Sequence, residues 1–397
     1  MIKSLFKWTL LASFVGFLTG VSSWAFFKSI AESIELRKSY PWIILFLPFV
    51  GALVAWGYSR YGKEIDAGSN LILDEIHAPK RHVAFRMVPM IFISSVLSHL
   101  FGASVGREGA AVQIGAGISD QFSRFMGSYF DNRRIVLMSG MSAGFAAIFG
   151  APIAGAVFGM EVLMIGAISY EALFPCLISA IVGFGTAQWL GISYFHQEGI
   201  NIPGLSLSSL FYSAIAGIVF GVVARFFLFT LHWIKINLSK KLPNPVYRPL
   251  FGGTIIVLFF FMTNSDRYLS LGEEVINASF TQLIYPWDFL GKIFTTAISV
   301  GSGFKGGEVM SLFYIGSTLG NALGFILPLP ISFVSALGFV AVFAGAANTP
   351  IAAIFLAINL FGSQIGIYAA IAIVMSYLFS GQNGLYHSQK KSIHQKL

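Results

Sequence analysis

Two glutamates lie in glycine-rich strings that each open an apolar segment. Glu108 belongs to Gly-Arg-Glu-Gly at residues 106–109, and Glu308 ends Gly-Phe-Lys-Gly-Gly-Glu at residues 303–308. Gly-Ser-Asn at residues 68–70 opens a third apolar segment. The first turn of a helix leaves backbone N–H groups unpaired at the positive end of the helix dipole, and glycine lets an ion approach them closely. Three such openings that converge predict an anion site.

Glu108 carries most of the expected chemistry. A carboxylate at the start of an intramembrane helix is itself an anion, so the helix dipole would hold it in the site while it is ionised. Protonation, or displacement by another anion, would release it. Because intramembrane ionisable groups are costly and usually functional, we interpret Glu108 as a gate and a proton carrier. The alternative is a glutamate that caps its helix at the membrane surface.

The composition places these strings in a membrane. The 397-residue chain is 56% hydrophobic and 11% charged, which is too little polar surface for a water-soluble protein. This excludes a cytosolic enzyme and a disordered scaffold. The net charge of +8 lies mostly in short loops and at both ends, which is typical of a membrane protein rather than of a nucleic-acid site. The single Cys176 and the seven scattered histidines lack paired ligand spacing, so we expect no metal and no cofactor.

The apolar segments predict an all-α, multi-pass protein whose helices are irregular. At about 20 apolar residues per crossing, the length predicts about ten crossings. Residues 8–27 and 41–58 are the first expected spans, and the polar residues 62–82 contain no full span. The later apolar segments lie at about 83–101, 134–168, 171–192, 207–234, 247–262, 286–300, 308–329, 331–361 and 364–380. Gly-Ala-Pro at 150–152 and Asn-Thr-Pro at 348–350 break two of them. Breaks at membrane depth line a cavity or are buried in protein, so they predict a conduction path.

The breaks occur in pairs. Residues 106–115 match residues 307–316 at an offset of 201 (316 − 115), and residues 151–154 match residues 349–352 at an offset of 198 (352 − 154). These matches predict one transmembrane domain, 1–397, with internal repeats over about 83–192 and 286–380. In such proteins the substrate site lies at the interface of the repeats.

These residues resemble the CLC family of anion channels and anion/proton exchangers. Residues 106–115 are similar to the family's GREGPxVQxG segment, with Ala110 in place of proline. The GSGIP segment matches residues 68–72, the GxFxP segment matches residues 307–311, and the late anion-binding tyrosine matches Tyr386. Four segments in the family's order, spread from residue 68 to residue 386, make the resemblance specific.

The resemblance implies an inverted-repeat fold of many tilted and broken helices, a homodimer in membrane lipid, and a separate path for halide anions and protons in each subunit. It implies that Glu108 is the gating glutamate. The expected anion-binding residues are Ser69, Asn70, Gly106, Arg107, Gly109, Val309, Met310 and Tyr386. We expect a bacterial inner membrane with both termini in the cytoplasm. The chain ends eleven residues after Tyr386 (397 − 386), so we expect no cytoplasmic nucleotide-sensing domains.

Two departures from the family bear on proton coupling. Chloride/proton exchangers of the family carry an inner relay glutamate after an APxAG segment, and here that position falls on Val162. The neighbouring Glu161 is interpreted as structural. Glu308, in GFKGGEV, is instead similar to the family's fluoride-exporting branch, whose glutamate there takes part in proton coupling. The alternative for Glu308 is a buried ion pair with Lys305.

Ser69 and Met310 leave the halide open. The fluoride-exporting branch tends to carry methionine where this chain has the chloride-like Ser69, and Thr-Pro where this chain has Met310-Ser311. Fluoride needs strong hydrogen-bond donors to replace its water. The Met310 thioether stands in place of a hydroxyl donor of that branch, whereas the Ser69 hydroxyl supplies a donor. We therefore predict fluoride or chloride transport by anion/proton antiport with Glu108 as the gate. The alternative is a passive voltage-gated-type chloride channel without proton coupling.

Other classes of membrane protein fit the sequence less well. An intramembrane enzyme would need a catalytic constellation, and no GxSxG, HExxH or paired intramembrane aspartates occur. A transporter of organic solutes would explain the broken helices but not the four ordered segments. A membrane scaffold has no need for a glutamate between glycines at a helix break.

Overall fold

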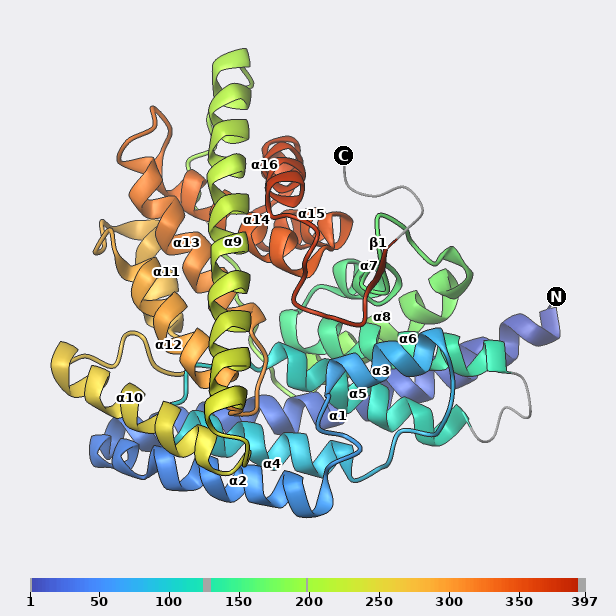
Figure 1. Ribbon diagram of the computed structural model, residues 1–397. Coiled ribbons are helices and arrows are strands. Elements are labelled where there is room, and N and C mark those ends of the chain that lie inside the picture. Colours follow the sequence, from blue (N-terminus) through green and yellow to red (C-terminus); the bar gives the residue numbers. More distant parts are fainter. Residues whose placement is uncertain (1, 124–129, 198, 392–397) are drawn as a thin grey trace.

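The structure, a computed structural model, describes residues 2–123, 130–197 and 199–391. Over these residues it is built almost wholly from helices, in two runs of eight (Figure 1). The first run is α1 (Ile2–Ser39), α2 (Leu47–Tyr61), α3 (Ser69–His77), α4 (Met87–Leu100), α5 (Glu108–Ser123), α6 (Phe130–Phe149), α7 (Pro152–Glu161) and α8 (Leu173–Trp189). The second run is α9 (Leu207–Lys241), α10 (Tyr247–Thr263), α11 (Glu273–Thr281), α12 (Asp288–Ser302), α13 (Val309–Gly324), α14 (Ile331–Ala347), α15 (Pro350–Phe361) and α16 (Gly366–Phe379). Short 3-10 helices cover Pro41–Phe46, Tyr170–Ala172 and Ser363–Ile365, and the two strands are β1 (Met164–Ile165) and β2 (Lys390–Lys391).

The longest helices, α1 and α9, extend beyond the apolar residues that predicted them. The predicted segment 8–27 lies within a helix of 38 residues, and the predicted segment 207–234 lies within a helix of 35 residues. Lysine and arginine fill the last turn of both helices, where cations interact favourably with the helix dipole. A reciprocal pair of hydrogen bonds between Ser206 and Ser209 caps the start of α9. Hydropathy marks the membrane-spanning core of such a helix but not its polar ends.

The two predicted breaks are confirmed. Gly150, with a φ of +69°, separates α6 from α7, and Asn348, with a φ of +58°, separates α14 from α15. Pro152 and Pro350 then each stand in the first helical turn, where the missing N–H costs no hydrogen bond. Of the helices described, four are long and apolar enough to cross a membrane, and five shorter apolar helices have 10–17 residues. The figure of about ten crossings stays a prediction, and the unequal helix lengths agree with the irregular helices expected from the sequence.

Helices of the same run pack closely through glycine. Gly115 of α5 lies against Gly140 of α6, and Gly316 of α13 lies against Gly338 of α14. In Figure 1 the blue and green helices of the first run lie along the base and the right, and the orange and red helices of the second run lie above and to the left. The apolar core continues from one run into the other.

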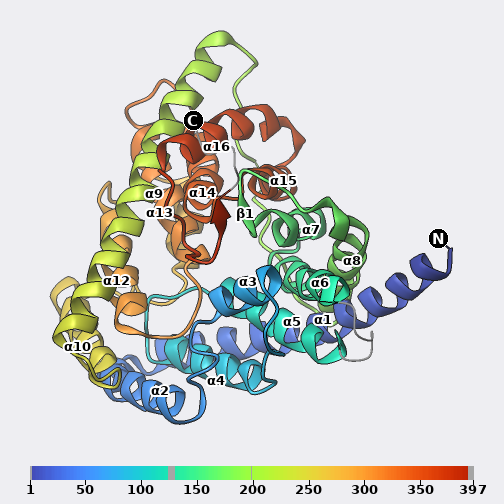
Figure 2. The same ribbon diagram turned by 45° about the vertical axis from the view of Figure 1, so that its right-hand side comes forward.

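The segment after α16 turns back into the centre of the molecule (Figure 2). Its backbone is held by three hydrogen bonds: Leu385 N to Ala346 O at 2.8 Å, Ser388 N to Asn70 Oδ1 at 3.1 Å, and Lys390 N to Leu163 O at 3.1 Å. β2 then pairs in parallel with β1. These contacts place Tyr386, which is 8% exposed, between the two runs of helices.

A buried ionic cluster ties α3 to α5 and α6. Arg133 donates to Glu75 Oε2 at 2.9 Å and to Asp120 Oδ1 at 2.7 Å. Glu75 also accepts from the backbone N–H groups of Lys80 and Arg81. Because burying a charge costs free energy unless it is paired and hydrogen-bonded, all three side chains must stay together. The cluster fixes the position of α3.

Candidate anion pathway

α5 and α13 begin at one point in the centre of the protein. Gly106 N donates to Gly307 O, and Gly307 N donates to Gly106 O at 2.6 Å, so the two strings form an antiparallel bridge. A Cβ atom on Gly307 would lie 2.6 Å from Gly109 N. Glycine is therefore required for this approach of two backbones. The predicted openings at α3, α5 and α13 are confirmed as helix starts.

The carboxylate of Glu108 lies at the start of α13. Glu108 is the first residue of α5 and is 1% exposed. Met310 N donates to its Oε2 at 3.2 Å. Its Oε1 has no hydrogen-bond partner among the described residues, and Arg107 Nε lies 3.8 Å away. The negative side chain thus occupies a helix N-terminus that could hold a free anion.

Gly109, which follows Glu108, lines a cavity of about 390 Å³ that we call the basic cavity. Four cationic side chains line it: Lys63, Lys235, Arg248 and Lys305. Five of the predicted site residues also line it: Ser69, Asn70, Gly109, Glu308 and Tyr386. Its walls come from α2, α3, α4, α5, α9, α10, the end of α12 and the segments that precede α3 and α13 and follow α16.

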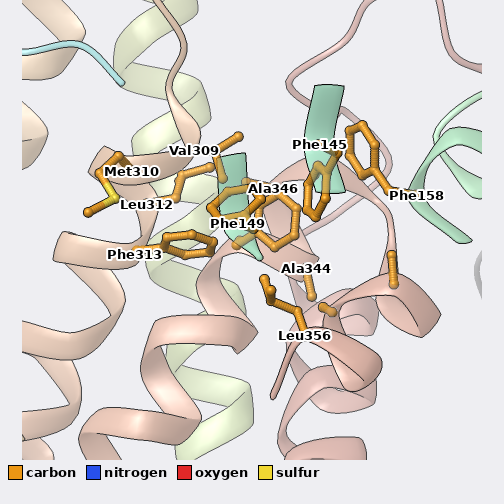
Figure 3. Packing of buried hydrophobic residues seen from close by; sticks show 14 of the residues in the cluster. Phe145, Phe149, Phe158, Val309, Met310, Leu312, Phe313, Ala344, Ala346 and Leu356 are labelled. Atoms are coloured by element: carbon orange, nitrogen blue, oxygen red, sulfur yellow. The ribbon is translucent and has the colours of Figure 1, made fainter. Parts of the chain in front are cut away.

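Glu108 itself lines a second cavity, of about 240 Å³, that shares no lining residue with the first and that we call the aromatic cavity. Its rings belong to Phe27, Phe149, Tyr194, Phe195, Phe313 and Phe339. Phe313 stacks on Phe339 with the ring centroids 4.0 Å apart, and Phe149 meets Phe313 at 5.4 Å. Figure 3 shows Phe149 facing Phe313 close to Met310. Arg107, Glu108, Glu273 and Met310 supply part of the remaining wall.

Comparison with known proteins identifies the family. The model of the voltage-gated chloride channel family matches residues 50–381. The chain belongs to this family, the CLC family. A chloride/fluoride channel protein of Pseudomonas syringae pv. tomato is 46% identical over 97% of this chain and 86% of that protein. A solved structure of a CLC-type fluoride/proton antiporter has a TM-score of 0.95 at 35% identity, over 99% of this chain and 100% of that chain.

More distant CLC proteins share the architecture. A proton/chloride exchange transporter of Vibrio cholerae is 26% identical over 75% of this chain and 68% of that protein. The structure of a slow cyanobacterial chloride/proton antiporter has a TM-score of 0.80 at 21% identity, over 94% of each chain. The chain is thus a multi-pass integral membrane protein of the CLC fold, and CLC proteins are channels and transporters rather than enzymes.

The structure divides the predicted CLC site residues between the two cavities. Arg107, Glu108 and Met310 line the aromatic cavity, while Gly106 lies in the bridge between the cavities. Val309 is 2% exposed and belongs to neither lining. Its side chain packs in the apolar core instead.

Two predicted residues make contacts that the sequence does not reveal. Ser69 Oγ accepts a hydrogen bond from Gln113 Nε2 at 3.2 Å, and Asn70 Oδ1 accepts from Ser388 N. Gln113, which lines the basic cavity, was not singled out although it lies in the matched segment 106–115. Asn70 ties the segment that carries Tyr386 to α3.

Glu308 is half-buried and immediately precedes α13. The expected alternative, an ion pair with Lys305, is wrong, because Lys305 Nζ binds Asp66 Oδ1 at 2.6 Å. The described residues contain no ion pair to Glu308, whose carboxyl group borders the basic cavity. Lys305 Nζ also lies 4.2 Å from the ring centroid of Tyr58.

Glu161 makes the contacts of a structural residue. Its two oxygens accept hydrogen bonds from Ile351 N at 2.9 Å and Ala352 N at 2.8 Å. The carboxylate therefore stabilises the start of α15. Val162, at the family's inner relay position, contributes its backbone oxygen to Gln389 Nε2 at 2.9 Å.

Proposed function

We propose that this chain exchanges fluoride for protons across a membrane, with Glu108 as the gate. The observation that carries the proposal is the contact between the Glu108 carboxylate and Met310 N, at the wall of the aromatic cavity, while the next residue, Gly109, lines the basic cavity. In this position the ionised side chain fills an anion site and closes the path. Protonation removes the charge that holds it there, so a halide can take its place.

Glu308 is the proposed second proton carrier. It borders the basic cavity, while Val162 occupies the position where chloride/proton exchangers carry a relay glutamate. Tyr386 lies within electrostatic reach of both Glu308 and Glu108. In this proposal the two glutamates carry the proton in succession, Glu308 at the basic cavity and Glu108 at the gate.

Fluoride is favoured by the likeness to a fluoride/proton antiporter over almost the whole chain. Two groups near the site fit a strongly hydrated anion: the Met310 N–H, which now binds Glu108, and the Ser69 hydroxyl. Ser69 accepts from Gln113, so its own proton is free to point toward an anion. The proposed role of Ser69, Asn70, Gly109, Val309, Met310 and Tyr386 is to surround that anion.

The test is halide efflux from proteoliposomes with a pH dye trapped inside. We expect fluoride efflux to drive protons inward and acidify the lumen, with chloride moving much more slowly. Glu308→Gln should keep fluoride movement but reduce the coupled proton flux at least about tenfold, because the inner carrier is lost. Glu64→Gln is the matched control, since Glu64 is exposed and paired with Arg86. Chloride movement without proton flux in the unmodified protein would contradict the proposal.

A passive chloride channel is the second candidate. Ser69 is the chloride-like residue at its position, and the relative from Pseudomonas syringae is named a chloride/fluoride channel protein. The same efflux measurement separates the candidates, because a channel moves halide without changing the luminal pH beyond the passive leak.

We also propose that the protein is a homodimer. α7 packs against α8 and α15, and α15 packs against α16. Their outward surfaces carry exposed apolar side chains, including Ile153, Ile181, Phe355 and Ile367. Light scattering of the detergent-solubilised protein should give two copies of the 43.1 kDa chain. In the variant Ile181→Cys the introduced cysteine should cross-link the subunits. The background should be low, because the native Cys176 is buried. A monomer in both measurements would contradict this proposal.

Residues 83–192 and 286–380 are proposed to be inverted copies within one domain, 1–397. The antiparallel pairing of Gly106 with Gly307 supports this relation, since each glycine stands two residues before the first residue of its helix, Glu108 in α5 and Val309 in α13. The offset of 201 (307 − 106) is that of the matched strings.

The repeat relation has a measurable consequence at Gly115 and Gly316. A Cβ atom at either position would collide with a backbone carbonyl of the next helix. Gly115→Ala and Gly316→Ala should therefore lower the unfolding temperature by similar amounts. A large loss at one position with none at the other would contradict equivalence.

The proposed location is a bacterial inner membrane with both termini in the cytoplasm. A bacterial relative and the exposed cations Lys390 and Lys391 near the C-terminus support it. Cysteine introduced at position 3 or 391 should escape a membrane-impermeant maleimide in intact spheroplasts and react after lysis. Labelling of intact spheroplasts at either position would contradict this orientation.

A further inference from the structure

The Arg107 guanidinium lies between two carboxylates. Its Nη2 is 3.0 Å from Glu273 Oε1, and its Nε is 3.8 Å from Glu108 Oε1. The guanidinium is also 4.2 Å from the ring centroid of Phe27, and the side chain is 10% exposed. Neither Arg107 Nε nor Glu108 Oε1 has a hydrogen-bond partner within the described ranges. The free oxygen of Glu108 therefore faces a cation whose charge is already shared with Glu273.

Glu273 is held in place by the loop that precedes α11. Lys292, which is fully buried, donates to Ser270 O at 2.6 Å, and Ser270 Oγ donates to His99 O at 3.1 Å. Tyr268 donates to Asp288 Oδ1 at 2.8 Å. Burying an ammonium group is costly, so the carbonyl contacts of Lys292 keep this loop from moving freely. Glu273 is thereby presented to Arg107 from a fixed backbone.

The other charged groups around Arg107 are paired among themselves. A side cavity of about 180 Å³ brings α1 and the loop before α11 together, and its charged lining is Glu35, Arg37, Lys38, Arg107, Asp266, Arg267, Glu273 and Glu274. Arg37 lies 3.8 Å from Asp266, and Lys38 lies 2.6 Å from Glu274 and 3.2 Å from Glu35. Arg267 binds Asp288. Among the described residues, Glu108 and Glu273 are the carboxylates within 4.0 Å of Arg107.

We infer that Glu273 is a positioning residue for the gate: by sharing Arg107 it weakens the hold of this cation on ionised Glu108. It thereby sets the pH at which the gate takes up its proton from the side of the aromatic cavity. The inference rests on the proposed gating role of Glu108. Removing the charge of Glu273 leaves the full charge of Arg107 to Glu108, and a nearby opposite charge favours the ionised form of a carboxyl group. Tyr386, which lines the basic cavity, is the further titratable group that interacts with Glu108.

Glu273→Gln tests the inference in proteoliposomes. The rate of fluoride-coupled proton flux is followed while the pH is varied on the side of the aromatic cavity. Glu273→Gln should move the midpoint of this profile to lower pH by about half a unit or more, because more acid is needed to release Glu108. Glu274→Gln is the matched control, since Glu274 follows in the same helical turn but pairs with Lys38. Glu273→Asp should restore most of the original profile.

A second measurement does not depend on transport. The infrared C=O band of protonated Glu108, identified by subtracting spectra of Glu108→Gln, can be titrated in detergent. Its midpoint should shift in the same direction in Glu273→Gln and stay unchanged in Glu274→Gln. Identical midpoints in the unmodified protein and Glu273→Gln would overturn the inference. If the band shifts while the unmodified protein moves halide without protons, the inference stands and the proposed exchange fails.

Discussion

The two cavities next to Glu108 and Gly109 differ in size and in chemistry. The basic cavity has about 390 Å³ and four cationic side chains, whereas the aromatic cavity has about 240 Å³ and a wall of phenylalanine rings with one arginine. In the proposed path the same halide ion passes through both. A cationic cleft raises the local concentration of a hydrated anion. An apolar chamber offers few groups to replace its water.

The two cavities thus act on the anion in different ways: the basic cavity attracts the hydrated anion, and the aromatic cavity requires it to lose water. The cations of the basic cavity come mostly from loops and helix ends, such as Lys63 and Arg248, rather than from the apolar core. The aromatic rings are core residues; Phe313 is fully buried and stacks on Phe339. The first cavity can therefore be tuned by surface substitutions, and the second only by changing the packing of α6, α13 and α14.

Gly307→Ala should have the largest effect, because it disrupts the backbone bridge between Gly106 and Gly307. Its Cβ atom would lie 2.6 Å from Gly109 N, so the starts of α5 and α13 must move apart. We expect fluoride flux to fall by about 100-fold, since a displacement of this size misplaces the groups that hold the gate. Gly185→Ala is the control, because its Cβ would have no atom within 4 Å. A normal rate in folded Gly307→Ala would contradict the account.

Arg133→Met should destabilise the α3 wall of the basic cavity. It leaves Glu75 and Asp120 buried without their cation, which costs about 3–5 kcal/mol in the free energy of unfolding. Arg134→Met is the neighbouring control: its partner Glu171 is half exposed, so we expect about 0–1 kcal/mol. Denaturant unfolding in micelles compares the two variants. Equal losses would show that the buried cluster does not hold α3.

Lys235→Gln should have the smallest effect of the three substitutions. It tests whether the charge of the basic cavity attracts the anion. Lys235 lines the basic cavity, so removing its charge should lower the fluoride flux about threefold at low ionic strength, and less at high salt. Lys241, at the end of α9 and outside the cavity lining, provides the control substitution Lys241→Gln. A loss that persists in high salt would indicate a direct contact rather than a field effect.

Local signals in the sequence predicted the parts of the fold that glycine and proline determine. The breaks before Pro152 and Pro350 and the helix start at Glu108 follow from backbone restrictions that act within a few residues. Glu108 could also be recognised as the candidate gate, because a carboxylate between glycines in an apolar segment is rare. The helix α11 was not predicted, since its nine residues are too short and too polar to form an apolar segment.

Contacts between distant residues could not be predicted in this way. The pairing of Lys305 with Asp66 spans 239 positions, and that of Arg107 with Glu273 depends on how α11 is placed beside α5. The aromatic cavity joins rings from helices far apart in the sequence, and no periodicity in the phenylalanine-rich segments marks which rings meet. Tertiary packing, rather than local propensity, determines these positions.

Fluoride and proton flux in Glu108→Gln test the central claim most directly. Glutamine keeps the size of the side chain but can neither ionise nor carry a proton. In proteoliposomes with an imposed fluoride gradient and a trapped pH dye, the account predicts that the unmodified protein acidifies the lumen and that Glu108→Gln abolishes this proton movement. Undiminished, fluoride-coupled acidification in Glu108→Gln would contradict the account.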